Sequence, residues 1–307
     1  MAISDRYRAQ VALLVRVMPA VAAQDVFALK GGTAINLFVR DMPRLSVDID
    51  LTYLPVQDRA ASLADIDTAM GRIAADIAGQ LPKAKVTPQV GSEGAVTRLL
   101  VHEGGAQIKI EVTPVTRGCV YPTVRMTLSP AVQEAFGFAE MQVVSLPDLF
   151  AGKIVAALDR QHPRDLFDVR DLLRNEGVSP ELRRAFLVYM ISHNRQLNEV
   201  LKFNAKDLTF EYERNFVGMT DESVPLEDLI AARAELHQIM VKRMPDEHRR
   251  FLLSFKKGEP DWSLLGVAEA ANLPAVRWKI ENLNRLPAAK RQSELGRLEE
   301  ALAVVGG

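Results

Sequence analysis

A change of pattern near residue 145 constrains the fold of this 307-residue chain more than any other feature. Before that point, strand-like and helix-like segments alternate, whereas after it helical spacing dominates, with breaks at isolated prolines. A chain of this length has room for two domains, because domains commonly hold about 100–200 residues. The sequence therefore predicts an α/β domain with a mixed sheet over residues 1–145 and a mostly helical domain over residues 146–307.

Apolar residues recur either every three to four positions or at alternate positions, and the two spacings separate helices from strands. The predicted helices cover residues 5–22, 31–40, 58–80, 145–160 and 164–174, and the predicted strands cover residues 46–53, 96–102, 107–113 and 141–144. The second and third strands are expected to form a hairpin that turns through residues 103–106, which include two glycines.

Membrane and disulfide classes are excluded by composition. No run of apolar residues approaches the ~18 needed to cross a bilayer, and the charged residues within 1–25 break the apolar centre that a signal peptide requires. Cys119 is the only cysteine, so neither an intramolecular disulfide nor a cysteine metal cluster is possible. We therefore expect a cytoplasmic protein without a membrane partner.

The formal net charge of −1 excludes a strongly basic nucleic-acid-binding chain. If nucleic acid is a partner, a local patch must hold it. Adjacent basic residues of the second half are candidates for such a patch: Arg183–Arg184, Lys242–Arg243, Arg249–Arg250 and Lys256–Lys257. The alternative is that each pair lies on a solvated helix face.

Two carboxylates on one strand give the strongest chemical signal. In residues 46–53, alternation places Asp48 and Asp50 on one face and apolar residues on the other. Like charges side by side on a sheet are unfavourable without a cation. Such a pair can instead hold magnesium ions for in-line displacement at phosphorus. The alternative is a solvated strand face.

A glycine pair lies upstream of the acid pair. Gly31 and Gly32 follow Lys30 and open a helix with Thr33, and free N–H groups at a helix start favour an anion such as phosphate. A plain turn would explain the glycines alone, but the combination with the acid strand is more specific. Ser46 is two residues before Asp48, on the same strand face, and is a further candidate phosphate contact.

Further charged residues complete the candidate site. Glu111 is expected on the polar face of its strand, where it would complete the metal shell or accept a proton if that strand neighbours the acid pair. The alternative is an exposed face formed by Lys109 and Glu111.

Lys153 lies inside an apolar helix, and Arg160 is two turns further on. Phosphate neutralisation would explain this lysine, although a lysine snorkelling from a core helix is the alternative. Asp165 and Asp168 open the next helix and share a face. One of them would orient Lys153 or Arg160, and the other would be an ordinary acid of the first turn, favoured by the helix dipole.

Four blocks in this order resemble one known family. The blocks are KGGTA (30–34), RLSVDIDL (44–51), KIVAALDR (153–160) and RDLFDV (164–169). Together they resemble the AbiEii/AbiGii-type nucleotidyltransferase toxins of the DNA polymerase β-like superfamily. The resemblance covers about residues 25–175.

The resemblance implies a role for several residues. It implies that Asp48 and Asp50 bind metal, that Gly32 and Thr33 contact nucleotide phosphate, and that Lys153 and Asp165 enter the active site. It further implies a magnesium-dependent enzyme that uses a nucleoside triphosphate and acts as a toxin in a toxin–antitoxin or phage-defence pair. An RNA acceptor, in particular the 3′ end of tRNA, and an antitoxin partner are expected on the same ground.

Two alternatives remain open from the residues. The segment from Asp48 to Thr52 also fits the signature of haloacid-dehalogenase-type phosphatases, but a later acidic pair on a strand end is missing and the glycine helix would have no use. The second alternative is a module that binds nucleotide, RNA or a protein without turnover. The intact acid pair argues against it, because a protein without turnover has no need of paired carboxylates.

Overall fold

The computed structural model describes residues 5–202 and 204–305. The chain forms two compact units, one of Met1–Ser145 with Gly218–Ser223 and one of Leu146–Val217 with Val224–Gly307. The first unit contains a mixed sheet and the second is helical, which confirms the predicted fold class. A short segment from the second half of the chain, residues 218–223, thus belongs to the first unit.

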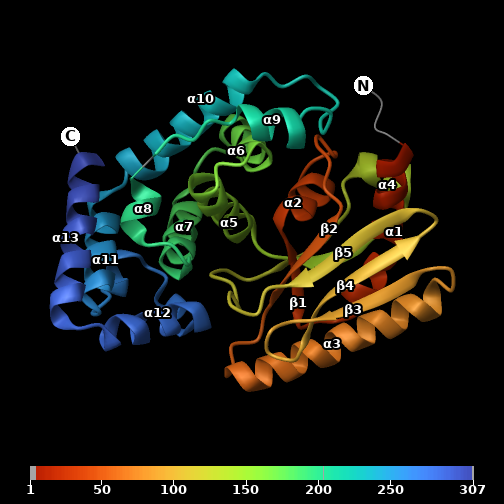
Figure 1. Cartoon of the computed structure of the whole chain (residues 1–307), viewed down its shortest axis with the longest axis horizontal. Helices are drawn as coiled ribbons and strands as arrows, with labels where there is room; N and C mark the ends of the chain where they lie inside the picture. Colours follow the sequence, from red (N-terminus) through yellow and green to blue (C-terminus); the bar gives the residue numbers. More distant parts are fainter. Residues whose placement is uncertain (1–4, 203, 306–307) are drawn as a thin grey trace. The chain divides into compact units, whose positions relative to one another are not determined.

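The first unit is built on a seven-stranded sheet of order β3-β4-β5-β2-β1-β7-β6 (Figure 1). Its strands are β1 (Phe27–Lys30), β2 (Asp48–Tyr53), β3 (Lys85–Val90), β4 (Val96–Glu103), β5 (Ala106–Val112), β6 (Val124–Thr127) and β7 (Glu140–Val143). The β2–β5 and β1–β7 pairs are parallel and the others are antiparallel. The acid strand β2 therefore lies in the middle of a mixed sheet.

Long helices cover the apolar face of this sheet. The helical segments of the unit are α1 (Asp5–Ala22), α2 (Gly31–Thr33), η1 (Ala34–Val39), α3 (Arg59–Gln80) and α4 (Pro130–Phe136). Figure 1 shows α3 running along β3 and β4, and α1 packs on β5 and β7. Ile49 and Leu51 of β2 are fully buried. Alternation then directs Asp48 and Asp50 to the opposite face.

The predicted helix over residues 31–40 is present, but its hydrogen bonding widens after the first turn. The Arg40 N–H donates to the Ile35 carbonyl, five residues back, at 2.9 Å. The Asn36 side chain donates to the Gly32 carbonyl at 2.8 Å, so a side chain satisfies part of the widened turn. The segment therefore continues the glycine turn as a buried helical element.

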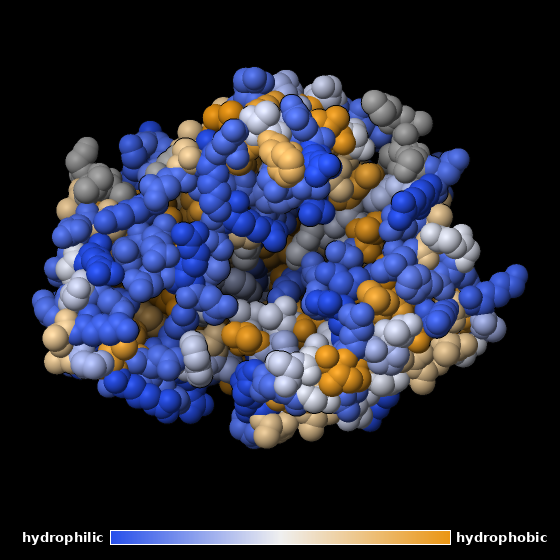
Figure 2. Space-filling model, viewed as in Figure 1, coloured by the Kyte–Doolittle hydropathy of each residue, from blue (hydrophilic) through white to orange (hydrophobic). Residues whose placement is uncertain are grey.

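The second unit consists of helices. They are α5 (Leu146–Asp159), α6 (Pro163–Asn175), α7 (Pro180–Ser192), α8 (Leu197–Leu201), α9 (Thr209–Asn215), α10 (Leu226–His237), η2 (Gln238–Lys242), α11 (Asp246–Lys257), η3 (Trp262–Leu264), η4 (Ala268–Asn272), α12 (Pro274–Arg285) and α13 (Ala288–Val305). Prolines occupy the first turn of α6, α7 and α12, where the missing N–H costs nothing. On the face seen in Figure 2, hydrophilic residues cover most of this unit.

Candidate active site

A row of charged residues crosses four neighbouring strands of the sheet. Asp50 of β2 is paired in register with Glu111 of β5 on one side and with Lys30 of β1 on the other. Glu111 is in turn paired with Arg98 of β4. Directly paired residues point to the same face of a sheet, so these four side chains share the face that is opposite the apolar core. The strand of Glu111 thus neighbours the acid strand, which was the condition set for its predicted role.

Burial is the main influence on the Asp50 carboxylate. Its burial raises its pKa above the ordinary value, and the neighbouring Asp48 raises it further, while Lys109 and Lys30 oppose the shift. Within residues 5–202 and 204–305, no hydrogen bond or ion pair reaches the Asp50 carboxylate. A desolvated carboxylate beside a like charge is a favourable position for a bound cation.

The glycine turn lies directly against this carboxylate. Gly31 has φ +77°, and a Cβ at this position would lie 2.9 Å from Asp50 Oδ2. At Gly32, a Cβ would lie 2.7 Å from Arg44 Nη2 and 2.8 Å from Ser46 Oγ. Both positions therefore need glycine, the first for its backbone conformation and close approach and the second for space.

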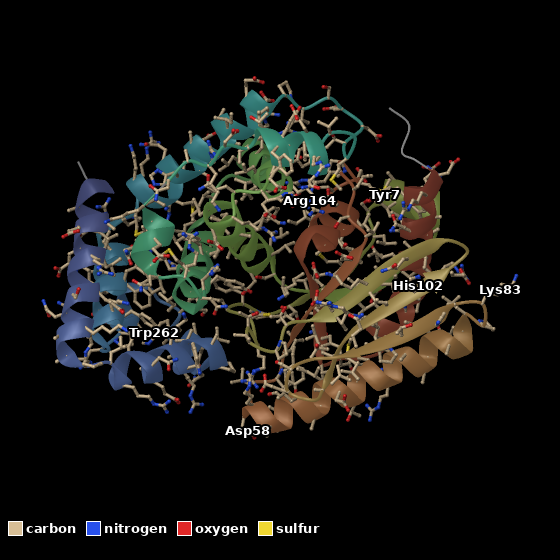
Figure 3. The ribbon with its side chains drawn as sticks, viewed as in Figure 1. Tyr7, Asp58, Lys83, His102, Arg164 and Trp262 are labelled. Carbon is tan, nitrogen blue, oxygen red and sulfur yellow. The ribbon has the colours of Figure 1, made fainter. Side chains whose placement is uncertain are left out.

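Ser46 is held by residues from distant parts of the sequence. Its backbone N–H donates to the Tyr7 hydroxyl at 2.6 Å, and Tyr7 lies on α1, where Figure 3 labels it. Its hydroxyl is 3.1 Å from Thr33 Oγ1, which also donates to the Asp48 carbonyl. Thr33 and Ser46, two predicted nucleotide contacts, are thereby joined to the acid strand. Burial raises the pKa of Tyr7 to about 12, so this phenol remains a neutral donor and acceptor.

The loop before the acid strand is also tied to residues 218–223. Arg44 forms an isolated antiparallel bridge with Thr220, and the Leu45 N–H donates to the Met219 carbonyl at 2.8 Å. Arg44 is only 3% exposed, so its guanidinium is part of the interior against which Gly32 packs. The sequence contained no signal for this pairing, because its partners are about 175 residues apart.

Glu111 is occupied by two cations. Lys109 Nζ lies 2.8 Å from Glu111 Oε2 and 3.6 Å from Asp48 Oδ2, and Arg98 pairs with the other oxygen of Glu111. Although burial acts in the opposite direction, hydrogen bonds from Lys109 and Arg98 hold the pKa of Glu111 below its ordinary value. In the part of the chain that the structure describes, no group of three or more His, Cys, Asp or Glu side chains is gathered closely enough to hold a metal ion. The acids share a face without converging on one point.

Lys153 belongs to a buried charge cluster in the helical unit. Its ammonium, on α5, lies 2.8 Å from Asp165 Oδ1 and 3.0 Å from Asp168 Oδ2, both on α6. Its side chain is 8% exposed, and those of the two acids are 1% exposed. Arg160 donates two hydrogen bonds to Asp165, and its side chain is 62% exposed. Burial would raise the pKa of Asp165, but Lys153 and Arg160 hold it far below the ordinary value.

The turn between α5 and α6 contains a residue that the sequence analysis missed. Gln161 adopts φ 53°, which is uncommon for a residue other than glycine. Its buried amide donates to the Asn204 carbonyl at 2.8 Å and accepts hydrogen bonds from the Lys206 N–H and from Arg233 at 3.0 Å. These bonds fix the turn that carries Arg160. The glutamine-histidine-proline sequence gave no signal of this role.

His162 and three of the basic pairs have structural roles. His162 Nδ1 accepts the Arg164 N–H and caps α6. One member of each of three pairs bonds within the unit: Arg183 to the Ile239 carbonyl, Arg249 to the Met244 and Leu302 carbonyls, and Lys256 to Glu294. These three side chains of the candidate patch therefore hold helices of the unit together.

Comparison with known proteins was decisive for the family. The sequence model described as "Nucleotidyl transferase AbiEii toxin, Type IV TA system" matches residues 12–282. The chain belongs to the AbiEii nucleotidyltransferase toxin family. The resemblance drawn from the four blocks is thereby confirmed. No match was found among curated protein sequences.

A solved structure is similar over nearly the whole chain. It is MenT4, a nucleotidyltransferase toxin from Mycobacterium tuberculosis H37Rv, with 17% identity and a TM-score of 0.52. The match covers 98% of this chain and 92% of that one. At this identity the similarity shows the shared fold.

Family membership establishes the class of protein. This AbiEii chain is a nucleotidyltransferase, a toxin of a type IV toxin–antitoxin system, with a nucleoside triphosphate substrate and an antitoxin partner. Nucleotidyltransferases of this kind generally use a divalent metal. These findings decide against the phosphatase alternative. Among the described residues, no helix combines the length and apolarity needed to span a bilayer.

Proposed function

We propose that this toxin transfers a nucleoside monophosphate from a triphosphate to an RNA hydroxyl in a magnesium-dependent reaction. The observation that carries the proposal is the position of the Asp50 carboxylate against Gly31, which brings a cation-binding group and a phosphate-binding turn together. The acceptor oxygen would form a bond to the α-phosphorus while the bond to the β-phosphate oxygen breaks. Pyrophosphate then leaves, and the acceptor proton passes to solvent or to a carboxylate.

Asp48 and Asp50 are the residues that would hold the metal. Their fit is supported by their shared face, by the desolvation of Asp50 and by the preference of magnesium for carboxylate oxygens. When bound, the metal would neutralise the negative charge that builds on the phosphates. Glu111 is proposed as the third acid, and it must first exchange its pairing with Lys109 for that role.

Gly31, Gly32 and Thr33 would contact the phosphates through free N–H groups of the turn. Ser46 would contribute its hydroxyl, since it already lies within hydrogen-bond distance of Thr33. The absence of a side chain at Gly31 supports phosphate binding by the turn, because a Cβ there would fill the space beside Asp50. Together these residues would orient the triphosphate, which is the main requirement in phosphoryl transfer.

We further propose, from the family resemblance, that Lys153 contacts a phosphate of the substrate. The Lys153 ammonium has three hydrogens, and two of them point to Asp165 and Asp168. The third would serve a phosphate oxygen, and the exposed guanidinium of Arg160 would serve another. Asp165 would orient both cations. The resemblance of blocks 153–160 and 164–169 to the family supports this assignment.

The RNA acceptor, with the tRNA 3′ end as the first candidate, is supported by the family resemblance, as is a role in phage defence. The cytoplasm remains the expected location of the protein. The test therefore offers every triphosphate and both RNA and protein acceptors.

The test is to incubate the protein with magnesium, each α-labelled triphosphate in turn, and total RNA together with total protein. We expect label in RNA, and we expect Asp50→Asn to reduce the transfer by about 100-fold or more, the typical loss of a charge-stabilising group. Asp41→Asn is the matched control, because Asp41 is exposed and outside the site. Label in protein would contradict the RNA acceptor. Full transfer by folded Asp50→Asn would contradict the mechanism.

A further inference from the structure

Lys109 is a cation that lies among the acids of the proposed metal site. β5 runs parallel to β2, and register pairing places Lys109 opposite Asp48. Its ammonium contacts Glu111 at 2.8 Å and Asp48 at 3.6 Å, and its charge also acts on Asp50. One side chain thus faces all three acids.

We propose that Lys109 is an internal counter-ion of the acid cluster, which a divalent metal must displace, and that it sets the metal concentration that the enzyme requires. This inference rests on the proposed function, because it assumes that Asp48 and Asp50 hold the metal. It assigns to Lys109 a role in metal binding that the acid pair alone does not imply.

The arrangement of the other cations supports this role. Arg98 contacts Glu111 from the β4 side, away from β2. Lys30 lies on the β1 side of Asp50. Of these cations, Lys109 is the one that contacts acids of both β2 and β5, so its charge lies beside the acids that would hold a metal.

An ammonium and a divalent ion cannot share this position. Magnesium binds carboxylate oxygens at about 2.0–2.1 Å, whereas Lys109 contacts oxygens on both strands at hydrogen-bond or ion-pair distance. Two like charges at such separations repel strongly in a partly buried site. The side chain of Lys109 is 28% exposed, and its flexible stem gives it a route outward to solvent or to a bound phosphate. Metal binding is therefore expected to be coupled to movement of Lys109.

The alternative is an ordinary ion pair that only stabilises the sheet. Both interpretations predict that loss of Lys109 lowers stability without metal. They differ in the metal dependence, because only a counter-ion competes with the metal. Removing a competitor makes the metal bind at a lower concentration, whereas removing an ordinary surface ion pair leaves the metal affinity unchanged.

The experiment is a magnesium and manganese titration of thermal unfolding, without nucleotide or acceptor, on the full chain and on Lys109→Met. We expect the variant to melt lower without metal and to reach half of its metal-induced rise in Tm at a concentration lower by on the order of ten-fold. Lys109→Arg, which keeps the charge, should stay near the wild-type midpoint. Lys85→Met is the matched control, because Lys85 is an exposed lysine of the same sheet.

A metal midpoint of Lys109→Met within two-fold of that of Lys85→Met would overturn the proposal, as would a higher midpoint. If Lys109→Met fails to fold, Lys109→Gln is measured against the same criterion. Because no transfer is measured, failure of the labelling experiment and failure of this titration are separate results. Absence of any metal-induced change in Tm in both wild type and variant would also overturn the proposal.

Discussion

Replacement of Lys153 by methionine is the perturbation whose cost the structure defines best. Methionine keeps most of the stem length but removes the ammonium that lies 2.8 Å from Asp165 and 3.0 Å from Asp168. Both carboxylates are 1% exposed, so water cannot replace the lost partner. Breaking a buried ion pair by removing one partner typically costs about 3–5 kcal/mol. Arg160 still neutralises Asp165, which places the expected loss of unfolding free energy near the lower end of that range.

This loss is measurable by urea and thermal unfolding. For a unit of about 150–250 residues, each kcal/mol shifts Tm by about 2–4 °C, so Lys153→Met should melt roughly 6–12 °C lower. The double variant Lys153→Met with Asp168→Asn should recover part of the loss, because it removes one of the two buried charges. A loss below about 1 kcal/mol, or no recovery in the double variant, would refute the argument that the lysine balances both acids.

The same variant matters for the interpretation of activity. Loss of transfer in Lys153→Met is evidence for a phosphate contact only at a temperature at which the variant is folded. Circular dichroism at the assay temperature is therefore the necessary companion measurement. A folded variant with full transfer activity would show that the cluster is structural alone.

Three other perturbations test the rest of the site. Gly31→Ala should lower the unfolding free energy by about 1–2 kcal/mol, because alanine disfavours the left-handed backbone there, and should reduce transfer by displacing Asp50. Gly71→Ala is the control, because an added Cβ on α3 meets no atom within 4 Å, and it should be neutral or stabilising. Equal effects of the two variants on urea unfolding would contradict this prediction. Ser46→Glu should abolish label transfer, because it adds a negative charge and bulk beside the glycine turn, while Ser46→Ala should retain most of it; an active Ser46→Glu would count against a phosphate at this position. Because the pKa of Asp165 is lowered in the folded protein, its carboxylate stabilises the fold above the unfolded-state pKa of about 3.9, and this stability is lost as the pH falls below that pKa. The Tm should therefore fall between about pH 5 and pH 2. In Asp165→Asn the Tm should fall less over the same range.

Elements with a strong local pattern were predictable from the sequence. The alternation in residues 46–53 identified β2, and the two glycines between alternating segments identified the β4–β5 hairpin. Periodicity also identified α1, α3, α5 and α6 close to their observed bounds. These patterns suffice because the half-buried strands and helices carry their polar and apolar faces in their own residues.

Strands without such a pattern were missed. The first three of the four residues of β1 are buried, on both faces of the sheet, so β1 shows no alternation of apolar and polar residues. β3 is an edge strand that is mostly exposed and contains a proline, so it lacks the apolar alternation that identifies a half-buried strand. Because β1 has no alternating pattern, the sequence does not predict that Lys30 lies beside Asp50, where register pairing places it.

The tertiary neighbours of the site were equally beyond a sequence argument. Tyr7 contacts Ser46 across 39 positions of the chain, and Thr220 pairs with Arg44 across a far longer separation. Nothing in either local sequence specifies the other, since these contacts depend on where the sheet and its connections bring the backbone. The chemistry of the motif residues was predictable, but the residues that hold them in place were not.

The charge balance of the sheet face changes how the acid pair is understood. From the sequence, a divalent cation was the expected means of making two adjacent carboxylates tolerable. In the folded unit, side-chain cations already offset part of the repulsion between the two carboxylates. Lys109 contacts Asp48, and Lys30 is paired in register with Asp50. The burial that raises the pKa of Asp50 is thus offset only in part, which leaves a site that is stable enough to fold and still electrostatically favourable for a metal. A site fully neutralised by its own residues would gain little from a metal, and one without them would place uncompensated acids in the middle of the sheet.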